Sequence, residues 1–77
     1  MNKIAVIIPA FNEALSIGYV IEAVPNQVHE IIIVDNNSTD ITKDIAKDKG
    51  ATVLFEPKKG YGHACLKGID YLATDPP

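Results

Sequence analysis

The chain has 77 residues, enough for one small domain, and 47% of them are hydrophobic, which is ordinary for a globular protein. Its net charge is −3 and its charges are scattered rather than gathered in basic blocks, which argues against a nucleic-acid partner. Its single cysteine, Cys65, excludes an internal disulfide and is typical of a buried thiol in a reducing cytoplasm, and no apolar run reaches the roughly 20 residues that span a bilayer.

Three short apolar runs indicate the strands of an α/β chain. Residues 4–8 and 31–34 are continuous and rich in β-branched side chains, which is typical of parallel strands buried on both faces. Pro9 is expected to end the first of them. Residues 52–55 form a weaker third strand.

Two helical patterns separate these strands. The first has Ser16 as its expected N-cap and Pro25 as its stop, and the second has Asp40 as its N-cap and Gly50 as its stop. Apolar residues at helical spacing give each pattern one face to bury. These residues are Ile17, Val20, Ile21 and Val24 in the first helix, and Ile41 and Ile45 in the second.

A third helix is expected over residues 62–72, with Ala64, Cys65, Ile69 and Leu72 on its inner face. Because crossovers between parallel strands are right-handed, the strands should form a three-stranded parallel sheet in the order 3-2-1, half of a Rossmann-like doubly wound sheet. The first two helices then cover one face of the sheet and only the third covers the other. The uncovered part predicts self-association into a homo-oligomer.

Polar segments follow all three strands, and ligands of parallel α/β sheets bind beyond the carboxyl ends of the strands. The first segment, Pro9-Ala10-Phe11-Asn12-Glu13, lacks the glycines of a dinucleotide-binding turn, which disfavours a nicotinamide cofactor. Glu13 has two interpretations. It complements the positive end of the next helix, or it accepts a hydrogen bond from a ribose hydroxyl or a base edge.

The second segment is Val34-Asp35-Asn36-Asn37-Ser38-Thr39-Asp40. Asp35 either accepts hydrogen bonds from a nucleoside or closes an Asx turn with the N–H groups that follow it. Asp40 is better interpreted as a helix cap. Residues 36–39 have the composition of a turn, with no specific chemistry implied.

The third segment, Gly60-Tyr61-Gly62-His63-Ala64, opens the third helix. Gly60 and Gly62 either let a phosphate approach the helix N-terminus or only make the loop flexible. Tyr61 either stacks on a base or closes the loop. His63 has no partner at metal-ligand spacing, so we expect a surface residue.

The order and spacing of PAFNE, VDNNSTD and GYGHACLKGID resemble those of the family-2 glycosyltransferases, in particular the polyprenyl-phosphate sugar transferases related to dolichol-phosphate mannosyltransferase. The resemblance covers essentially the whole chain. It implies the N-terminal half of a GT-A fold that binds a nucleotide-sugar. The nucleotide-binding residues that it implies are Pro9, Phe11, Glu13, Asp35, Gly60 and Gly62.

The implied reaction transfers a sugar from a UDP- or GDP-sugar, with inversion, to an acceptor such as a polyprenyl phosphate. A divalent metal, Mg²⁺ or Mn²⁺, would bridge the diphosphate leaving group. The family's metal-binding Asp-x-Asp motif follows the next strand and does not occur in residues 1–77. We therefore expect residues 1–77 to be the nucleotide-binding part truncated before that motif, inactive alone, with no catalytic residue and no metal.

The expected location is the cytoplasm. For the full-length protein, a location at the membrane surface is the alternative. The alternative hypothesis is a non-catalytic α/β interaction domain that associates with itself through the uncovered sheet face.

Overall fold

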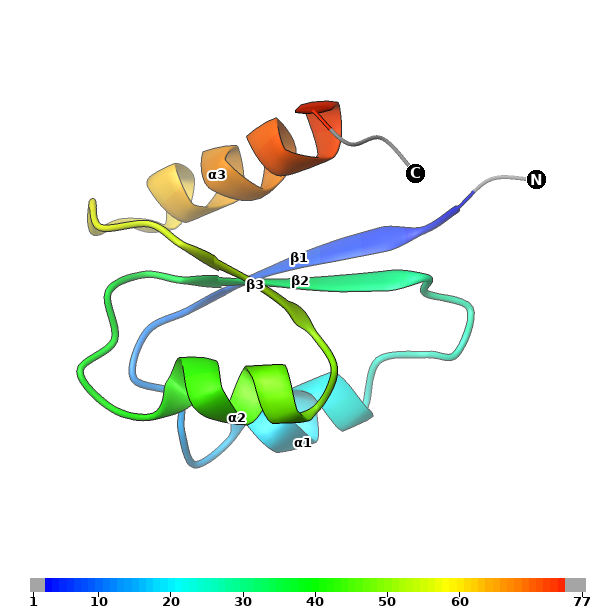
Figure 1. The fold of residues 1–77 in the computed structure, drawn as a ribbon, viewed down its shortest axis with the longest axis horizontal. Helices are drawn as coiled ribbons and strands as arrows, with labels where there is room; N and C mark the ends of the chain where they lie inside the picture. Colours follow the sequence, from blue (N-terminus) through cyan, green and yellow to red (C-terminus); the bar gives the residue numbers. More distant parts are fainter. Residues whose placement is uncertain (1–2, 75–77) are drawn as a thin grey trace.

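Residues 3–74, which the computed structural model describes, form alternating β-strands and α-helices (Figure 1). The strands are β1 (Ala5–Ala10), β2 (Glu30–Asp35) and β3 (Thr52–Phe55), and the helices are α1 (Ile17–Glu22), α2 (Thr42–Asp48) and α3 (Tyr61–Thr74). All the strands are parallel and β2 lies in the centre, which confirms the predicted sheet order. No helix in residues 3–74 is long and apolar enough to cross a membrane.

Two apolar layers bury the central strand from both sides. Helices α1 and α2 lie against one face of the sheet and α3 lies against the other, as right-handed crossovers predict (Figure 1). Successive side chains of a strand point to opposite faces, so Ile33 packs in the α1–α2 layer while Ile32 and Val34 pack beneath α3. These three side chains have no exposed surface.

The inner faces of the helices differ from the prediction at three apolar residues. Val20, Ile41 and Ile69 are 40%, 59% and 53% exposed. Ile41 precedes the first residue of α2, so it lies outside the buried stripe of that helix. The inner stripe of α3 runs through Gly68, which leaves Ile69 in solvent and Cys65 half-buried. The residues buried instead are Thr42 and Ala46 on α2, and Ala64 and Gly68 on α3.

The prediction that Pro9 ends the first strand is wrong. β1 continues to Ala10, and Pro9 is in register with Val34 of β2. Proline has no N–H to donate to a second neighbour, and β1 is an edge strand of this sheet, where that loss is tolerated.

The helix ends agree with the sequence in part. Ser16 is the N-cap of α1, but its hydroxyl donates to Glu13 rather than capping a backbone group. The N-cap of α2 is Ile41, one residue after the predicted Asp40. Gly50 follows the end of α2 with a φ of +87°, a conformation that L side chains rarely adopt, and so it stops the helix as predicted.

Helix α3 approaches β1 most closely at Gly68, and two alanine substitutions test this packing. A Cβ added at Gly68 would lie 2.6 Å from Cγ2 of Ile7, whose β-branched side chain is stiff. We expect Gly68→Ala to lower the free energy of unfolding by about 1–2 kcal/mol, because overpacking outweighs the helix propensity of alanine. Urea unfolding measures the change.

The control is Gly62→Ala in the same helix, where an added Cβ meets nothing within 4 Å. It should raise the free energy of unfolding by up to about 1 kcal/mol. A gain in both variants would contradict the close approach at Gly68.

Candidate functional site

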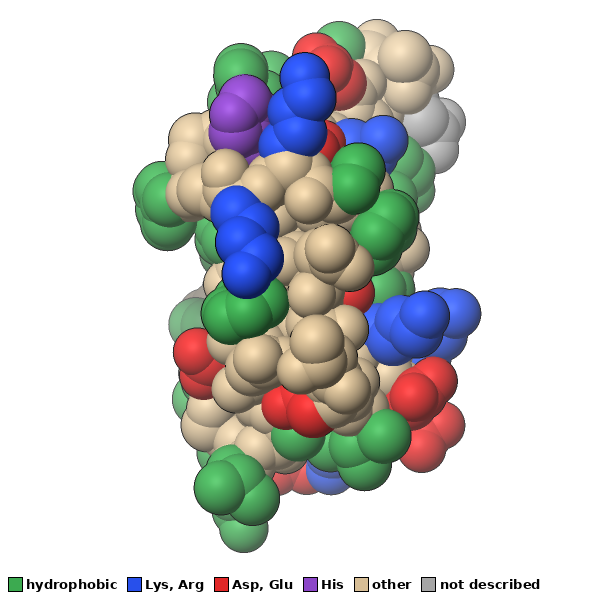
Figure 2. All heavy atoms as spheres, turned by 90° about the vertical axis from the view of Figure 1, so that its left-hand side faces the viewer, with side chains coloured by type: hydrophobic (Ala, Val, Ile, Leu, Met, Phe, Trp, Pro, Cys, Tyr) green, Lys and Arg blue, Asp and Glu red, His purple; other side chains and the backbone are tan. Residues whose placement is uncertain are grey.

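The carboxyl ends of the three strands meet at one edge of the sheet, and all three predicted segments lie there. Ala10, Asp35 and Phe55 are in register at the ends of the strands. Figure 2 looks onto this edge, where hydrophobic, basic and acidic side chains all reach the surface. A cavity of about 200 Å³ opens here, lined by Pro9, Ala10, Phe11, Asn36 and Tyr61.

Two aromatic rings and a lysine give this cavity its chemical character. Phe11 is 41% exposed and Tyr61 is 74% exposed, so both rings offer a face to a ligand. The ammonium of Lys59 lies 4.8 Å from the centroid of the Phe11 ring, within the range of a cation–π interaction. An apolar wall beside a cation suits a flat, anionic ligand.

Asp35, the last residue of β2, is 2% exposed. Its Oδ1 atom is buried and has no hydrogen-bond partner among the described residues. The Asx turn of the alternative interpretation of Asp35, in which Asn37 or Ser38 would donate to this carboxylate, is therefore not formed at Oδ1. An unpaired buried acceptor costs free energy, so this oxygen is suited to receive a donor from a ligand.

Asn36 is the residue that sequence reasoning missed. It is 8% exposed, and its Nδ2 donates to the carbonyls of Glu56 (2.9 Å) and Lys58 (2.7 Å). Its Oδ1 accepts from the N–H of Gly60 at 3.0 Å. The sequence signal that could have identified Asn36 is its place as a second polar residue directly after Asp35. Neighbouring residues at a strand end point to opposite faces of the sheet, so a polar residue here can serve a different face from Asp35.

The loops after β1 and β2 are joined by hydrogen bonds. The N–H of Asn12 donates to Oγ of Ser38 (2.9 Å), and the N–H of Thr39 donates to Oδ1 of Asn12 (2.8 Å). The N–H of Glu13 donates to Oγ1 of Thr42 at 2.9 Å. Asn12 has a φ of +52°, which asparagine tolerates better than most residues. The loop that carries Phe11 is thus fixed to its neighbour.

Ile41 is the N-cap of α2 in place of the predicted Asp40, but Asp40 still binds the start of that helix from one residue before the cap. Its carboxylate accepts from the N–H of Thr42 (3.0 Å), from the Thr42 hydroxyl, and from the N–H of Ala14 (3.2 Å). The hydrogen bond from the Thr42 hydroxyl is the main cause that lowers the pKa of Asp40. Asp40 therefore ties the start of α2 to the loop before α1.

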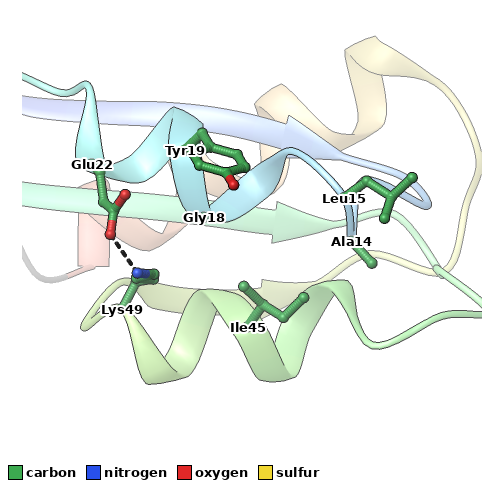
Figure 3. Close-up of a pocket in the computed structure, with 7 residues that line it drawn as sticks. All are labelled: Ala14, Leu15, Gly18, Tyr19, Glu22, Ile45 and Lys49. Atoms are coloured by element: carbon green, nitrogen blue, oxygen red, sulfur yellow. Dashed lines mark hydrogen bonds and ion pairs between the residues drawn. The ribbon is translucent and has the colours of Figure 1, made fainter.

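A second cavity lies between α1 and α2 and extends to Ala14 and Leu15 in the loop before α1 (Figure 3). It has a volume of about 480 Å³, and Leu15 and Tyr19 on its rim are 95% and 76% exposed. An ion pair between Lys49 and Glu22 crosses one end and raises the pKa of the Lys49 ammonium. None of the six predicted nucleotide-binding residues lines this groove.

The family assignment rests on nearly the whole chain. The model of the family "Glycosyl transferase family 2" matches residues 5–75. The chain belongs to glycosyl transferase family 2. The resemblance of the three motifs to family 2 is thereby confirmed, and the particular likeness to polyprenyl-phosphate sugar transferases stays a prediction.

Individual relatives agree with this family. An uncharacterized glycosyltransferase of Mycobacterium bovis is 41% identical over 75 residues, which are 97% of this chain and 34% of the relative. Protein RfbJ of Shigella flexneri is 47% identical over 75 residues, covering 95% of this chain and 58% of the relative. The 4,4'-diaponeurosporenoate glycosyltransferase of Staphylococcus aureus is 34% identical over 82 residues, covering 96% and 22%.

A solved structure shares the fold. Glucosyl-3-phosphoglycerate synthase from Mycobacterium tuberculosis, in complex with Mn²⁺, UDP-glucose and phosphoglyceric acid, superposes with a TM-score of 0.78 at 31% identity. The match covers 90% of this chain and 29% of that one, which confirms the predicted GT-A fold. The chain spans only part of each glycosyltransferase that it matches.

Four of the six predicted nucleotide-binding residues of this family 2 chain lie at or beside the cavity. Pro9 and Phe11 line it. Asp35 adjoins it, because its register partner on β1, Ala10, and the next residue in the chain, Asn36, are lining residues. Gly60 is bonded to Asn36. Their contacts with a nucleotide stay a prediction.

Glu13 and Gly62 lie outside the lining of the cavity. Oε2 of Glu13 accepts from the hydroxyl of Ser16 at 2.9 Å, and Gly62 is exposed in the first turn of α3. The role of both in nucleotide binding also stays a prediction.

The described residues do not by themselves form the metal site of a family 2 glycosyltransferase. No group of three His, Cys, Asp or Glu side chains that could hold a metal ion occurs within residues 3–74. Of the two acids in the second segment, Asp40 is already engaged by Thr42 and Ala14. No chemical step through a metal is therefore assigned to these residues.

Proposed function

We propose that this chain binds the nucleoside diphosphate of a UDP- or GDP-sugar at the carboxyl edge of its sheet, as the nucleotide-binding portion of an inverting glycosyltransferase. The observation that carries the proposal is the cavity of about 200 Å³ between Phe11 and Tyr61. The solved synthase with the same fold contains UDP-glucose and Mn²⁺, which supports a ligand of this class.

Each part of a nucleoside diphosphate has a complementary group at this edge. The faces of Phe11 and Tyr61 suit stacking on a base, and the unpaired Oδ1 of Asp35 suits an N–H or hydroxyl donor. The ammonium of Lys59 and the N-terminus of α3 favour the negative diphosphate. This edge therefore binds and orients the donor substrate.

In the proposed reaction, an acceptor oxygen attacks the anomeric carbon and the nucleoside diphosphate leaves from the opposite side, which inverts the configuration. A divalent cation, when bound, neutralises the charge of this leaving group. The three motifs favour a polyprenyl phosphate as acceptor. We also propose a cytoplasmic location, with the full-length protein at the membrane surface.

Alanine substitution of Tyr61 tests the nucleotide site. Stacking on an aromatic ring contributes about 1–3 kcal/mol per base, so Tyr61→Ala should weaken UDP or GDP binding at least about fivefold. Titration of the chain with UDP and with GDP, followed by NMR, measures the affinity. Wild-type shifts should concentrate at residues 9–11, 35–36 and 59–61.

The matched control is Tyr19→Ala. Tyr19 is 76% exposed and Tyr61 is 74% exposed, but Tyr19 lies beside the α1–α2 groove (Figure 3). The affinity of the Tyr19→Ala variant for UDP or GDP should equal that of the wild type. Absence of shifts at the carboxyl edge at millimolar nucleotide would refute the proposal.

A second candidate function, self-association, is favoured by the edges of the sheet. Within the described residues β1 pairs with β2 alone, so its outer edge offers unpaired backbone groups to another strand. Leu66 and Ile69 on α3 are 59% and 53% exposed and add apolar surface. Sedimentation at rising protein concentration tests this proposal, and a persistent monomer would contradict it.

A further inference from the structure

We propose that Asn36 is a positioning residue of the nucleotide site. Its amide holds residues 56–60 against the end of β2 and so sets where Lys59 and Tyr61 stand relative to Phe11. Asn36 acts on the nucleotide through this segment. The effect on affinity rests on the proposed function, whereas the effect on the segment itself does not.

The hydrogen-bonding capacity of Asn36 is almost entirely used within the protein. An asparagine side chain has two N–H donors and one carbonyl acceptor. Both donors go to the carbonyls of Glu56 and Lys58, and the acceptor receives the N–H of Gly60. No N–H of the amide is left for a nucleobase, so recognition by this side chain is indirect.

Asn36 also connects the two walls of the cavity. Its backbone N–H donates to the carbonyl of Ala10 at 2.8 Å, next to Phe11 on the β1 wall. Its side chain holds the segment that precedes Tyr61 on the α3 wall. Asn36 therefore contributes to the spacing of the two aromatic rings.

The held segment requires an anchor because its conformation is unusual. Gly60 has a φ of +128°, and residues 57–60 are exposed. Lys59 lies between two residues bonded to the amide, Lys58 and Gly60, and its ammonium lies 4.8 Å from the centroid of the Phe11 ring. Loss of the amide should release Lys59 from the ring.

The variant Asn36→Asp tests this role because it preserves the shape of the side chain and the acceptor for Gly60. A carboxylate has no N–H, so both donor bonds are lost and an oxygen faces the carbonyls of Glu56 and Lys58. We expect amide hydrogen exchange in residues 58–60 to rise about tenfold or more in the free protein. The ring-current shift of the Lys59 side-chain protons should decrease, and the dissociation constant for UDP or GDP should rise about tenfold.

The matched control is Asn37→Asp, which adds the same charge one residue later at an exposed position with a φ of +66°. It should leave exchange, ring-current shift and affinity as in the wild type. If Asn36→Asp does not fold, Asn36→Ala removes the amide without adding charge and goes through the same measurements.

A double-mutant cycle with Tyr61→Ala separates positioning from direct contact. If Asn36 acts through the segment before Tyr61, the loss of affinity caused by Asn36→Asp should shrink in the Tyr61→Ala background. Equal losses in both backgrounds, or unchanged exchange in residues 58–60, would overturn the inference. A wild-type chain that binds no nucleotide would refute the proposed function alone, and the exchange and ring-current measurements would then decide the role of Asn36.

Discussion

Ile33→Ala should lower the free energy of unfolding by about 2–5 kcal/mol, the largest stability change that we expect for a single substitution in this chain. Ile33 has no exposed surface and packs in the α1–α2 layer against Ala10, Ile17, Ile21 and Ala46. The substitution removes buried apolar groups and leaves a cavity that two short helices cannot close. A domain of this size has a stability of roughly 4–12 kcal/mol, so the variant should be partly unfolded under mild denaturing conditions.

Urea unfolding monitored by circular dichroism measures this loss. The matched control is Ile69→Ala, because Ile69 is 53% exposed on the outer side of α3. Its free energy of unfolding should change by less than about 0.5 kcal/mol. Similar losses at Ile33 and Ile69 would contradict the two-layer arrangement.

Asp35→Asn should weaken nucleotide binding about tenfold or more while leaving the stability of the fold unchanged or higher. The charged acceptor at Oδ1 has no partner within the described residues, so its removal deprives the protein of no hydrogen bond at that atom. A hydrogen bond from the nucleotide to a charged group contributes about 1.5–3 kcal/mol, which corresponds to the expected loss of affinity. Weaker nucleotide binding together with unchanged or higher stability distinguishes a ligand-binding acid from a structural one.

The measurements are the UDP and GDP titrations together with urea unfolding of the same variant. Asp70→Asn on the exposed surface of α3 removes the same charge and should change neither quantity appreciably. An Asp35→Asn variant that binds normally would remove Asp35 from the site. A marked loss of stability would instead give this carboxylate a structural role.

The strands and their order were predictable because they depend on local pattern and chain handedness. The continuous apolar run Ile31–Val34 predicts a strand that is buried on both faces of the sheet. Right-handed crossovers then fix the sides on which the helices lie. The inner face of α3 was not predictable to the residue. Its rotation is set by the approach of Gly68 to Ile7, a contact between distant parts of the chain.

The same distinction between local pattern and tertiary contacts explains which residues of the site were predictable. Pro9 and Phe11 could be identified as cavity-lining residues because they lie at the carboxyl end of a strand, the edge where ligands bind. The role of Asn36 could not, because its partners at residues 56–60 belong to a loop whose path depends on tertiary packing. In sequence, Asn36 has the composition of an ordinary turn. The contact of Lys59 with Phe11 was hidden for the same reason.

The hydrogen bonds that join Asn12 to Ser38 and Thr39 bear on the thermodynamics of ligand capture. They hold the loop that carries Phe11 in place in the free protein, so this wall loses little conformational entropy when a ligand arrives. On the opposite wall, the three hydrogen bonds of the Asn36 amide hold residues 56–60 in the free protein in the same way. The proposed nucleotide would therefore meet a surface that is preformed on both sides, and its binding would lose little free energy to the ordering of these loops.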